Sequence, residues 1–395
     1  MVQPPPAIAR RQFLHLGLGV SVALATRPAW AGATIDGPHW DRILVLVELK
    51  GGNDGLNTVI PFADPAYRRL RPNLGIAREQ VVQLSPELGL HPALAPLTSA
   101  WQERDLAVLL GVGYPNPNRS HFRSIEIWDT ASASSQTLND GWIARAFAQN
   151  RRPPAMNIDT VVIDDNTLPM SGNGMRNVVM RDAEQFIAQA RRIKEGGMDR
   201  SANPALRHVL AVQHEVHQAA LTLSERMKAA PEPPVPFAQN PFGRQLDLAS
   251  RLLLSKLPIT TIKLALGGFD THARQREPHE RLLGVLGSGL AAFRAGLKQA
   301  GLWDKVLVLT YSEFGRRVEE NGSQGTDHGT AAPLFAMGGL VKGGFHGRQP
   351  SLTDLSEGDL KHNVDFRVVL STVLQRWWGL NHDLMPGPND VMAFV

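Results

Sequence analysis

The sequence predicts an α/β fold with a largely parallel central sheet. Short apolar runs bounded by glycine and proline alternate with amphipathic stretches along the chain. The apolar runs are continuous, which is typical of strands that are covered on both faces. The 395 residues, with 43 % apolar content, suffice for one large α/β domain or two smaller ones.

The individual elements follow from these patterns. The predicted strands are Ile43–Leu49, Leu106–Leu110, Val161–Ile163, Thr260–Leu266, Val306–Thr310 and Leu334–Met337. The predicted helices are Pro92–Arg104, His121–Ala133, Ala183–Lys194, Pro204–Ala229, Phe242–Leu257, Glu277–Ala300 and Phe366–Gly379. A proline-rich sequence, APEPPVPFAQNP, closes a purely helical region. We interpret residues 40–395 as a single domain with a helical insertion near 181–230.

Residues 1–31 resemble a twin-arginine export signal. Arg10 and Arg11 precede a moderately apolar segment that ends in the sequence AWA, and we expect cleavage after Ala31. The alternative is an uncleaved membrane anchor, but the apolar run has roughly a dozen residues, whereas a span needs ~20. We therefore expect a periplasmic or secreted protein with no stable membrane span, exported by the twin-arginine machinery.

The composition excludes several classes of function and of metal site. The 41 basic and 37 acidic residues are interspersed, and the formal net charge is only +4. This gives no basis for nucleic-acid binding. Because the chain has no cysteine, it has neither disulfides nor thiolate ligands, so a metal must be bound by oxygen and imidazole.

Polar residues follow several predicted strands at the point where each strand ends. Asp54 follows the first strand, Asp270 and His272 follow a later one, and Glu313 follows the next. Open parallel sheets bind ligands outside the carboxyl ends of their strands, so we expect these motifs to converge on one site. Each motif by itself could instead be a turn or a helix N-cap, and their shared position favours the site.

The candidate metal ligands are four carboxylates and two imidazoles. They are Asp54, Asp270, His272, Glu313, Asp327 and His328. Clustered carboxylates need compensating cations, because uncompensated negative charge raises their pKa values. One or two divalent ions would supply the charge, and the oxygen-rich set is compatible with Zn²⁺, Mn²⁺, Mg²⁺ or Ca²⁺. Asp327 could bind the metal directly or orient His328 from outside the coordination shell.

Ser120 and Arg316 are the candidate catalytic residues. Ser120 lies at a predicted helix start, where positive potential attracts anions, and a metal-activated hydroxyl could attack phosphorus or sulfur. Its alternative role is that of an N-cap. Arg316 could donate to the oxygens of a phosphate or sulfate, or it could be solvated or ion-paired.

Several motifs resemble those of a known family. They are LVELKGGNDGLNTVIP, YPNPNRSHFRSIEIW, NPFGRQLDLASRLL, GGFDTH, SEFGRRVEENGSQGTDHG and NVDFRVVLSTVLQRWWG. Over nearly the whole mature chain they resemble the exported bacterial family called domain of unknown function 1501 (DUF1501), which is similar to the alkaline phosphatase and sulfatase superfamily. The resemblance implies an α/β/α core with a bimetal site at the C-terminal strand ends.

The resemblance also implies roles for individual residues. Asp54 resembles the first-strand metal ligand, Ser120 lies where the superfamily has its nucleophile, and Asp270, His272 and His328 resemble further ligands. The Asp-plus-His pair is spaced here by two residues instead of four. In addition, the sequence SEFGR stands where the superfamily has an adjacent Asp-His. These departures leave the number and identity of the metals open.

These observations favour an exported, metal-dependent hydrolase that acts on small anionic phosphate or sulfate esters. The alternative is a non-catalytic, exported binding or assembly protein that retains the fold with a structural metal. A third possibility is an anion- or glycan-binding module that uses arginines alone and holds no stoichiometric metal.

Overall fold

The computed structural model of the protein describes residues 38–150, 152–153, 156–192, 203–380 and 390–395. They belong to one compact unit, Gly37–Val395. The expected export signal, residues 1–31, lies outside the described residues. No helix in the described ranges is both long and apolar enough to cross a membrane.

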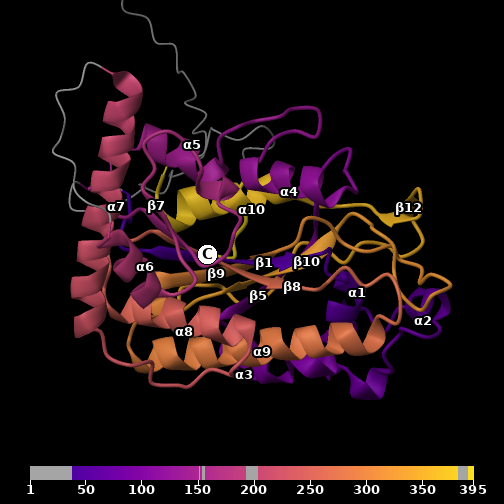
Figure 1. Ribbon diagram of the computed structural model, residues 1–395. Coiled ribbons are helices and arrows are strands. Elements are labelled where there is room, and N and C mark those ends of the chain that lie inside the picture. The colour runs from indigo at the N-terminus through magenta and orange to yellow at the C-terminus, as the bar shows by residue number, and fades with distance from the viewer. Residues whose placement is uncertain (1–37, 151, 154–155, 193–202, 381–389) are drawn as a thin grey trace, which may run out of the picture. The chain divides into compact units, whose positions relative to one another are not determined.

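A nine-stranded sheet forms the centre of this unit (Figure 1). Its order is β11-β5-β10-β9-β1-β8-β6-β7, and β14 pairs with β5. The strands are β1 (Ile43–Lys50), β5 (Leu106–Gly113), β6 (Thr160–Val162), β7 (Asn177–Val179), β8 (Thr261–Gly267), β9 (Val306–Tyr311), β10 (Ala332–Met337), β11 (Gly344–His346) and β14 (Val364–Asp365). All pairings are parallel except those of β10, which runs antiparallel to both β5 and β9.

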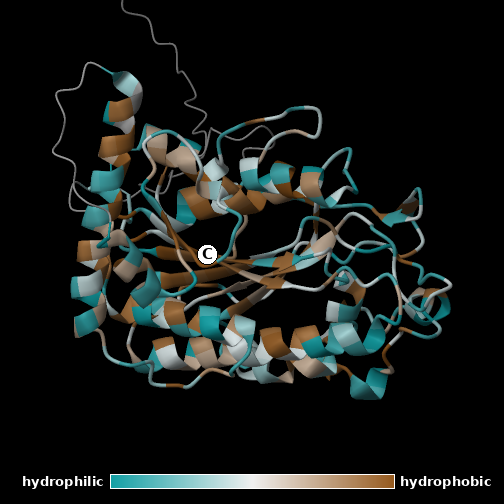
Figure 2. Cartoon of the chain, in the orientation of Figure 1, coloured by the Kyte–Doolittle hydropathy of each residue, from teal (hydrophilic) through white to brown (hydrophobic). Residues whose placement is uncertain are grey.

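Helices cover both faces of the sheet (Figure 1). One layer contains α4 (His121–Thr130), α5 (Trp142–Gln149) and α10 (Phe366–Thr372). The other contains α3 (Thr98–Gln102), α8 (Pro241–Leu254) and α9 (Arg276–Gln299). Alternate residues of β1 enter different cores, Val45 on the α9 side and Leu46 on the α4 side, because side chains alternate along a strand. The predicted three-layer α/β/α architecture with a mostly parallel sheet is confirmed, and its apolar strands are visible in Figure 2.

The remaining elements are short or lie at the margins. They are α1 (Gly55–Thr58), α2 (Pro65–Leu70), a sheet of β2 (Val59–Ile60), β3 (Val82–Gln83) and β4 (Gly89–Leu90), and a hairpin of β12 (Leu355–Ser356) and β13 (Asp359–Leu360). Two helices, α6 (Ala183–Ala190) and α7 (Pro204–Ala229), occupy the region where a helical insertion was expected.

The structure differs from the sequence expectation in several elements, and strands β7, β11 and β14 were not among those predicted. The predicted helix Pro92–Arg104 is a 3₁₀ segment, Pro92–Leu97, followed by α3, and Pro96 lacks the N–H that a continuous α-helix would use. Helix α5 was not expected. The antiparallel direction of β10 was also not expected, because periodicity carries no information about strand direction.

The sheet order brings three strand ends together. Strands β9, β1 and β8 are neighbours and mutually parallel, so the loops that follow them leave from one edge. Because β10 is antiparallel to β9, the chain between Tyr311 and Ala332 also starts and finishes at this edge. This geometry places residues 312–331 beside the loops that follow β1 and β8.

Candidate metal centre

Three imidazole nitrogens approach one carboxylate at this edge. The Nε2 atom of His272 lies 3.0 Å from Oδ1 of Asp270, and that of His328 lies 3.2 Å from the same oxygen. The Nε2 atom of His121 lies 3.4 Å from Oδ2. The Nε2 atoms of His272 and His328 are 3.0 Å apart. Ligand atoms of His121, Asp270 and His328 all lie within 4.8 Å of one another, the spacing of a possible metal site.

The other ring nitrogen of each histidine has a separate partner. The Nδ1 atom of His121 lies 2.7 Å from Oε1 of Glu313. The Nδ1 atom of His328 lies 2.8 Å from the backbone carbonyl oxygen of Arg119. The Nδ1 atom of His272 lies 3.4 Å from Oδ1 of Asp327. Metal-binding histidines commonly donate their second ring N–H to a carboxylate or carbonyl in this way.

The contacts of His328 decide what can occupy the space between these groups. A carbonyl oxygen only accepts, so the hydrogen of a neutral His328 ring lies on Nδ1 and a lone pair remains on Nε2. That lone pair faces a carboxylate oxygen, which also only accepts. These two acceptors can be balanced by a metal ion, by a second proton on His328, or by the Nε2 hydrogen of His272, which lies 3.0 Å from Nε2 of His328. Ligand atoms of a tetrahedral ion bound at about 2.0–2.1 Å would be about 3.3 Å apart, so the donor set fits a divalent metal.

Several elements supply these residues. His121 is the first residue of α4, Asp270 and His272 lie in the loop after β8, and His328 lies in the chain that leads to β10. Gly51, which follows β1, permits the close approach of the loop after β8 to the backbone at Gly51. A Cβ atom there would lie 2.4 Å from the backbone nitrogen of Asp270, and the φ of +114° is unfavourable for other residues.

Arg316 holds Asp270 in place from below the site. Its Nη2 donates to Oδ1 of Asp270 at 2.7 Å and to the carbonyl oxygen of Phe269 at 3.0 Å. Its Nε and Nη1 donate to the carbonyl oxygens of Gly52 and Thr326 at 2.6 and 2.8 Å. Partial burial raises the pKa of Asp270, but hydrogen bonds from Arg316 and a neighbouring histidine outweigh it and lower the pKa to about 2. The carboxylate is therefore ionised at neutral pH.

The centre is open to solvent on one side. The side chains of His272 and Asp270 are 44 % and 47 % exposed. On the buried side, the ring of Phe314 packs against His121 and His328, with centroid distances of 4.9 and 4.5 Å. An anionic molecule could thus reach the donors from the exposed side.

Ser120 immediately precedes His121 at this open side. It is exposed and is the N-cap residue of α4, but its hydroxyl makes no capping hydrogen bond. Its backbone N–H donates to Oδ1 of Asn118 at 2.8 Å. The hydroxyl is thus not committed to the capping role that the sequence left open.

Asp54 lies in a different group, beneath the centre. Its Oδ2 pairs with Nη1 of Arg71 at 2.5 Å and accepts a hydrogen bond from Gln275, and both charged side chains are fully buried. His279 lies in the same group, where its Nε2 donates a hydrogen bond to Oδ1 of Asn53 at 3.0 Å. Burial raises the pKa of Asp54, but Arg71 and His279 outweigh it, so the pKa lies below the ordinary value. The Oδ1 atom has no hydrogen-bond partner among the described residues.

The structure thus brings together part of the predicted ligand set. Asp270, His272 and His328 face one another, whereas Glu313 and Asp327 face the outer nitrogens of His121 and His272. Asp54 faces Arg71. Metal binding by Asp54, Glu313 and Asp327 stays a prediction, and each has a different partner here.

Two further observations concern residues outside that set. Arg316 was expected to contact substrate oxygens, but its side chain has no exposed surface and its donors are directed at Asp270 and backbone carbonyls. In this structure it is a positioning residue. His121 was not among the predicted ligands. The sequence feature that could have identified His121 is its position in RSH, at a predicted helix start beyond the strand Leu106–Leu110. A histidine in that position is equally compatible with a solvated helix terminus.

Comparison with known proteins identifies the family. The model of the family described as "Protein of unknown function (DUF1501)" matches residues 83–387. The chain belongs to this family. No curated protein matches the sequence.

Several solved structures are similar to this DUF1501 chain at low identity. A protein in the alkaline phosphatase superfamily from Vibrio parahaemolyticus has a TM-score of 0.40 and 10 % identity, over 88 % of this chain and 69 % of that one. The lipoteichoic acid synthase LtaP from Listeria monocytogenes has a TM-score of 0.35 and 9 % identity, over 78 % and 66 %. The C-terminal periplasmic domain of EcEptC from Escherichia coli, in complex with Zn, has a TM-score of 0.34 and 13 % identity, over 77 % and 73 %.

Proposed function

We propose that this DUF1501 protein is a metal-dependent hydrolase of small phosphate or sulfate esters. The observation that carries the proposal is the convergence of three Nε2 atoms on the Asp270 carboxylate, with the opposite ring nitrogens directed at Glu313, the Arg119 carbonyl and Asp327. Such an arrangement favours imidazoles whose Nε2 lone pairs are directed inward, which is the form that binds a metal.

One divalent ion would be held by His121, His272, His328 and Asp270. A second ion could be bound by Oδ1 of Asp54, which has no hydrogen-bond partner among the described residues. When bound, the ion supplies positive charge that polarises the phosphoryl or sulfuryl oxygens of an ester. Zn²⁺ suits this imidazole-rich set best, whereas Mg²⁺ and Ca²⁺ prefer oxygen ligands. Mn²⁺ accepts both kinds of ligand.

Ser120 is the proposed nucleophile. Its exposed, uncapped hydroxyl at the N-terminus of α4 lies next to His121, and the partial positive charge of the helix terminus favours the approach of an anionic ester. In the reaction the Oγ–P or Oγ–S bond forms as the bond to the leaving alcohol breaks. The Oγ proton is lost to solvent and the alcohol gains a proton. A water molecule then attacks the phosphorus or sulfur, the Oγ–P or Oγ–S bond breaks, and Ser120 regains its proton as phosphate or sulfate leaves.

Arg119 and Arg317 are better placed than Arg316 to bind the substrate anion. Their side chains are 35 % and 39 % exposed. Arg119 pairs with the buried Asp359 and also approaches Glu357 at 3.5 Å, while Arg317 Nε lies 3.8 Å from Asp359. The Arg317 guanidinium therefore retains donors that a phosphate or sulfate can use.

The decisive experiment combines metal analysis with an activity screen. The full chain, wild type and Ser120→Ala, would be analysed for bound metal and assayed with aryl phosphates, phosphodiesters and aryl sulfates. We expect stoichiometric metal in both proteins and turnover by the wild type alone. Turnover that survives Ser120→Ala would reject the nucleophile and keep the hydrolase. Absence of both metal and turnover would reject the proposal.

The same experiment distinguishes the hydrolase from the second candidate function, that of a non-catalytic protein with a structural metal. The link from Arg316 through Asp270 to three histidines is the feature that favours it, because a metal there would also fix the loops after β8 and β9. Stoichiometric metal without turnover of any ester, together with a lower melting temperature after metal removal, would support it.

Export to the periplasm is a separate proposal, based on Arg10 and Arg11. Cell fractionation of the wild type and a variant with both arginines replaced by lysine tests it. We expect the wild type outside the cytoplasm, shortened by about the length of residues 1–31, and the variant retained at full length. Equal distribution of the two proteins would contradict the proposal.

A further inference from the structure

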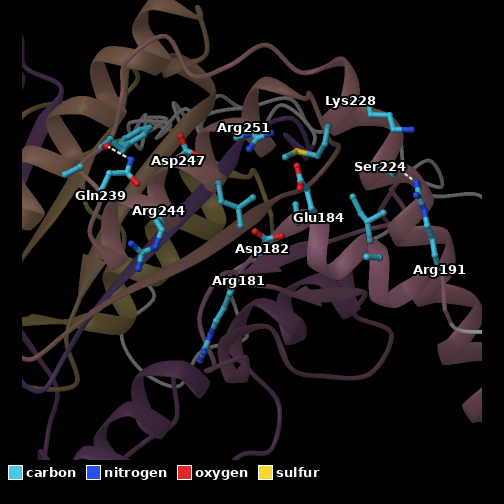
Figure 3. Close-up of a pocket in the computed structure, with 18 residues that line it drawn as sticks. Arg181, Asp182, Glu184, Arg191, Ser224, Lys228, Gln239, Arg244, Asp247 and Arg251 are labelled. Atoms are coloured by element: carbon cyan, nitrogen blue, oxygen red, sulfur yellow. Dashed lines mark hydrogen bonds between the residues drawn. The ribbon is translucent and has the colours of Figure 1, made fainter.

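A cavity of about 760 Å³ lies among α6, α7 and α8, apart from the metal centre (Figure 3). Its walls come from α6, from the C-terminal part of α7 and from the first turns of α8. None of the described metal-centre residues lines it. Its volume is in the range of ~300–1,000 Å³ that is typical of small-molecule sites.

Basic side chains dominate the rim of this cavity. The five basic residues are Arg181, Arg191, Lys228, Arg244 and Arg251, against three acidic ones, Asp182, Glu184 and Asp247. One of these carboxylates is already engaged, since Asp182 accepts a hydrogen bond from the backbone N–H of Gln185 at 2.7 Å and caps α6. Figure 3 shows Arg244 at the left of the labelled residues, Arg181 below them, and Arg191 and Lys228 at the right.

Most of these cations have no hydrogen-bond or ion-pair partner among the described residues. Arg191 donates to the hydroxyl of Ser224 at 3.0 Å. In the described part of the chain, the side chains of Arg181, Arg244 and Lys228 have neither a hydrogen bond nor an ion pair. Solvated arginines are common on protein surfaces, but here they surround a formed cavity and carry donors that a carboxylate, sulfate or phosphate group accepts.

The floor of the cavity is apolar. Phe237 and Leu248 are 8 % and 7 % exposed and belong to the core on the α9 side of the sheet, and Ile187 and Met227 pack against that core. A molecule in the cavity would therefore contact apolar side chains below and guanidinium groups at the rim. This combination suits a ligand with an apolar body and an anionic head group.

We propose that this cavity is a binding site for an anionic amphiphile, a molecule with an apolar portion and a sulfate, phosphate or carboxylate head group. The head group is bound by Arg181 and Arg244, and the apolar portion lies on Phe237, Leu248 and Met227. The site is independent of the proposed metal chemistry, so each can fail without the other.

The test uses 1-anilinonaphthalene-8-sulfonate, an anionic apolar dye that fluoresces in apolar surroundings. The full chain would be titrated as wild type, Arg244→Glu and Arg181→Glu, with Arg348→Glu as the matched control, because Arg348 is an exposed arginine outside the cavity. We expect saturable binding to the wild type and the control. Each cavity variant should bind at least about tenfold more weakly, the loss that follows removal of a charge-assisted hydrogen bond.

Two results would overturn the proposal. One is equal dye affinity in all four proteins. The other is equal or tighter binding of a cationic apolar dye of similar size, since the rim would then not select an anion. Thermal unfolding of every variant identifies a folding defect. If Arg244→Glu unfolds, Arg244→Gln replaces it, and decyl sulfate and decanoate as competitors then distinguish sulfate from carboxylate head groups.

Discussion

Two polar groups lie at the same edge of the sheet, and they differ in their exposure to water. In the candidate metal centre, Asp270 and His272 are 47 % and 44 % exposed. In the group below it, Asp54 and Arg71 have no exposed side-chain surface. Both groups contain a carboxylate that follows a strand of the sheet, so the position of an aspartate at a strand end does not by itself distinguish a binding site from a buried network.

The partners of each carboxylate explain the difference. Asp54 is neutralised by Arg71 and hydrogen-bonded to Gln275, which is how a buried charge is stabilised. Asp270 has Arg316 on one side and three imidazole nitrogens on the other. An imidazole nitrogen can bind either a proton or a metal ion. The Arg71 guanidinium, in contrast, stays protonated and cannot bind a metal. We therefore expect substitutions in the buried group to change stability, and substitutions in the exposed group to change ligand binding.

The largest expected effect is that of Arg71→Ala. It leaves the buried Asp54 without its cation, and breaking a buried ion pair costs about 3–5 kcal/mol. Urea denaturation measures the loss in the free energy of unfolding. Arg69→Ala, which replaces an exposed arginine two residues earlier in α2, is the control and should change stability little. A loss below about 1 kcal/mol for Arg71→Ala would show that the buried group is not structurally important.

His279 makes the stability of the buried group dependent on pH. Burial lowers the pKa of His279 to about 4, although Asp54 raises it in part. An unfolded histidine has a pKa near ~6.5, so between that value and about 4 the unfolded state binds more protons. Stability should therefore fall as the pH is lowered through this window, by up to about 3 kcal/mol.

Urea denaturation at pH 7 and pH 5 measures this dependence. His279→Gln should reduce the difference between the two pH values, and His39→Gln, a histidine outside the network, should leave it unchanged. A difference of the same size in His279→Gln and wild type would assign the titration to other groups. His91, whose pKa is also lowered by burial, is then the next candidate.

His328→Ala tests the exposed group. It removes one of the converging Nε2 atoms, and we expect metal affinity to fall by more than the roughly 10–100-fold that loss of an outer partner costs. Calorimetric titration with Zn²⁺ and the other divalent ions measures the affinity. His346→Ala, a histidine away from the centre, is the control. If the affinity for every ion were unchanged, the exposed group would not be a metal site. The proposed difference in role between the exposed and the buried group would then be wrong.

Glu313→Gln tests an outer partner in the same centre. The amide keeps the size of the side chain but weakens the acceptor for Nδ1 of His121, so we expect roughly a 10–100-fold loss of metal affinity. The same titration measures it. A loss as large as that of His328→Ala would indicate that Glu313 binds the metal directly, as the sequence suggested.

The smallest expected effect is that of Asp327→Asn. Its carboxylate is 58 % exposed and lies 3.4 Å from Nδ1 of His272, a longer contact than that of Glu313 with His121. We expect less than about a tenfold change in metal affinity, since an exposed pair contributes about 1 kcal/mol or less. A larger loss would mean that Asp327 moves into the coordination shell when metal binds.

The sequence by itself determined the longer strands of the sheet and most of the helices, because they depend on local periodicity, whereas the short strands β7, β11 and β14 were not predicted. The strands β1, β8 and β9 are as expected to within a residue or two, and α7 coincides with its prediction. The sequence also indicated that Asp270, His272 and His328 act together, since each follows or precedes a strand of one sheet. The PNPNRSH sequence was recognised as part of the site, but His121 was not distinguished from Ser120 within it.

Only the tertiary structure decided which of these residues meet. The antiparallel direction of β10 returns His328 to the edge where β8 ends, and strand direction depends on pairing between residues far apart in the sequence. The burial of Asp54 depends on Arg71 and Gln275, which approach it from two other segments. The cavity among α6, α7 and α8 likewise exists only after these helices pack. Contacts of this kind depend on non-local packing, whereas the period of an apolar run is local, and this is why the sequence predicted the elements and the fold selected the site.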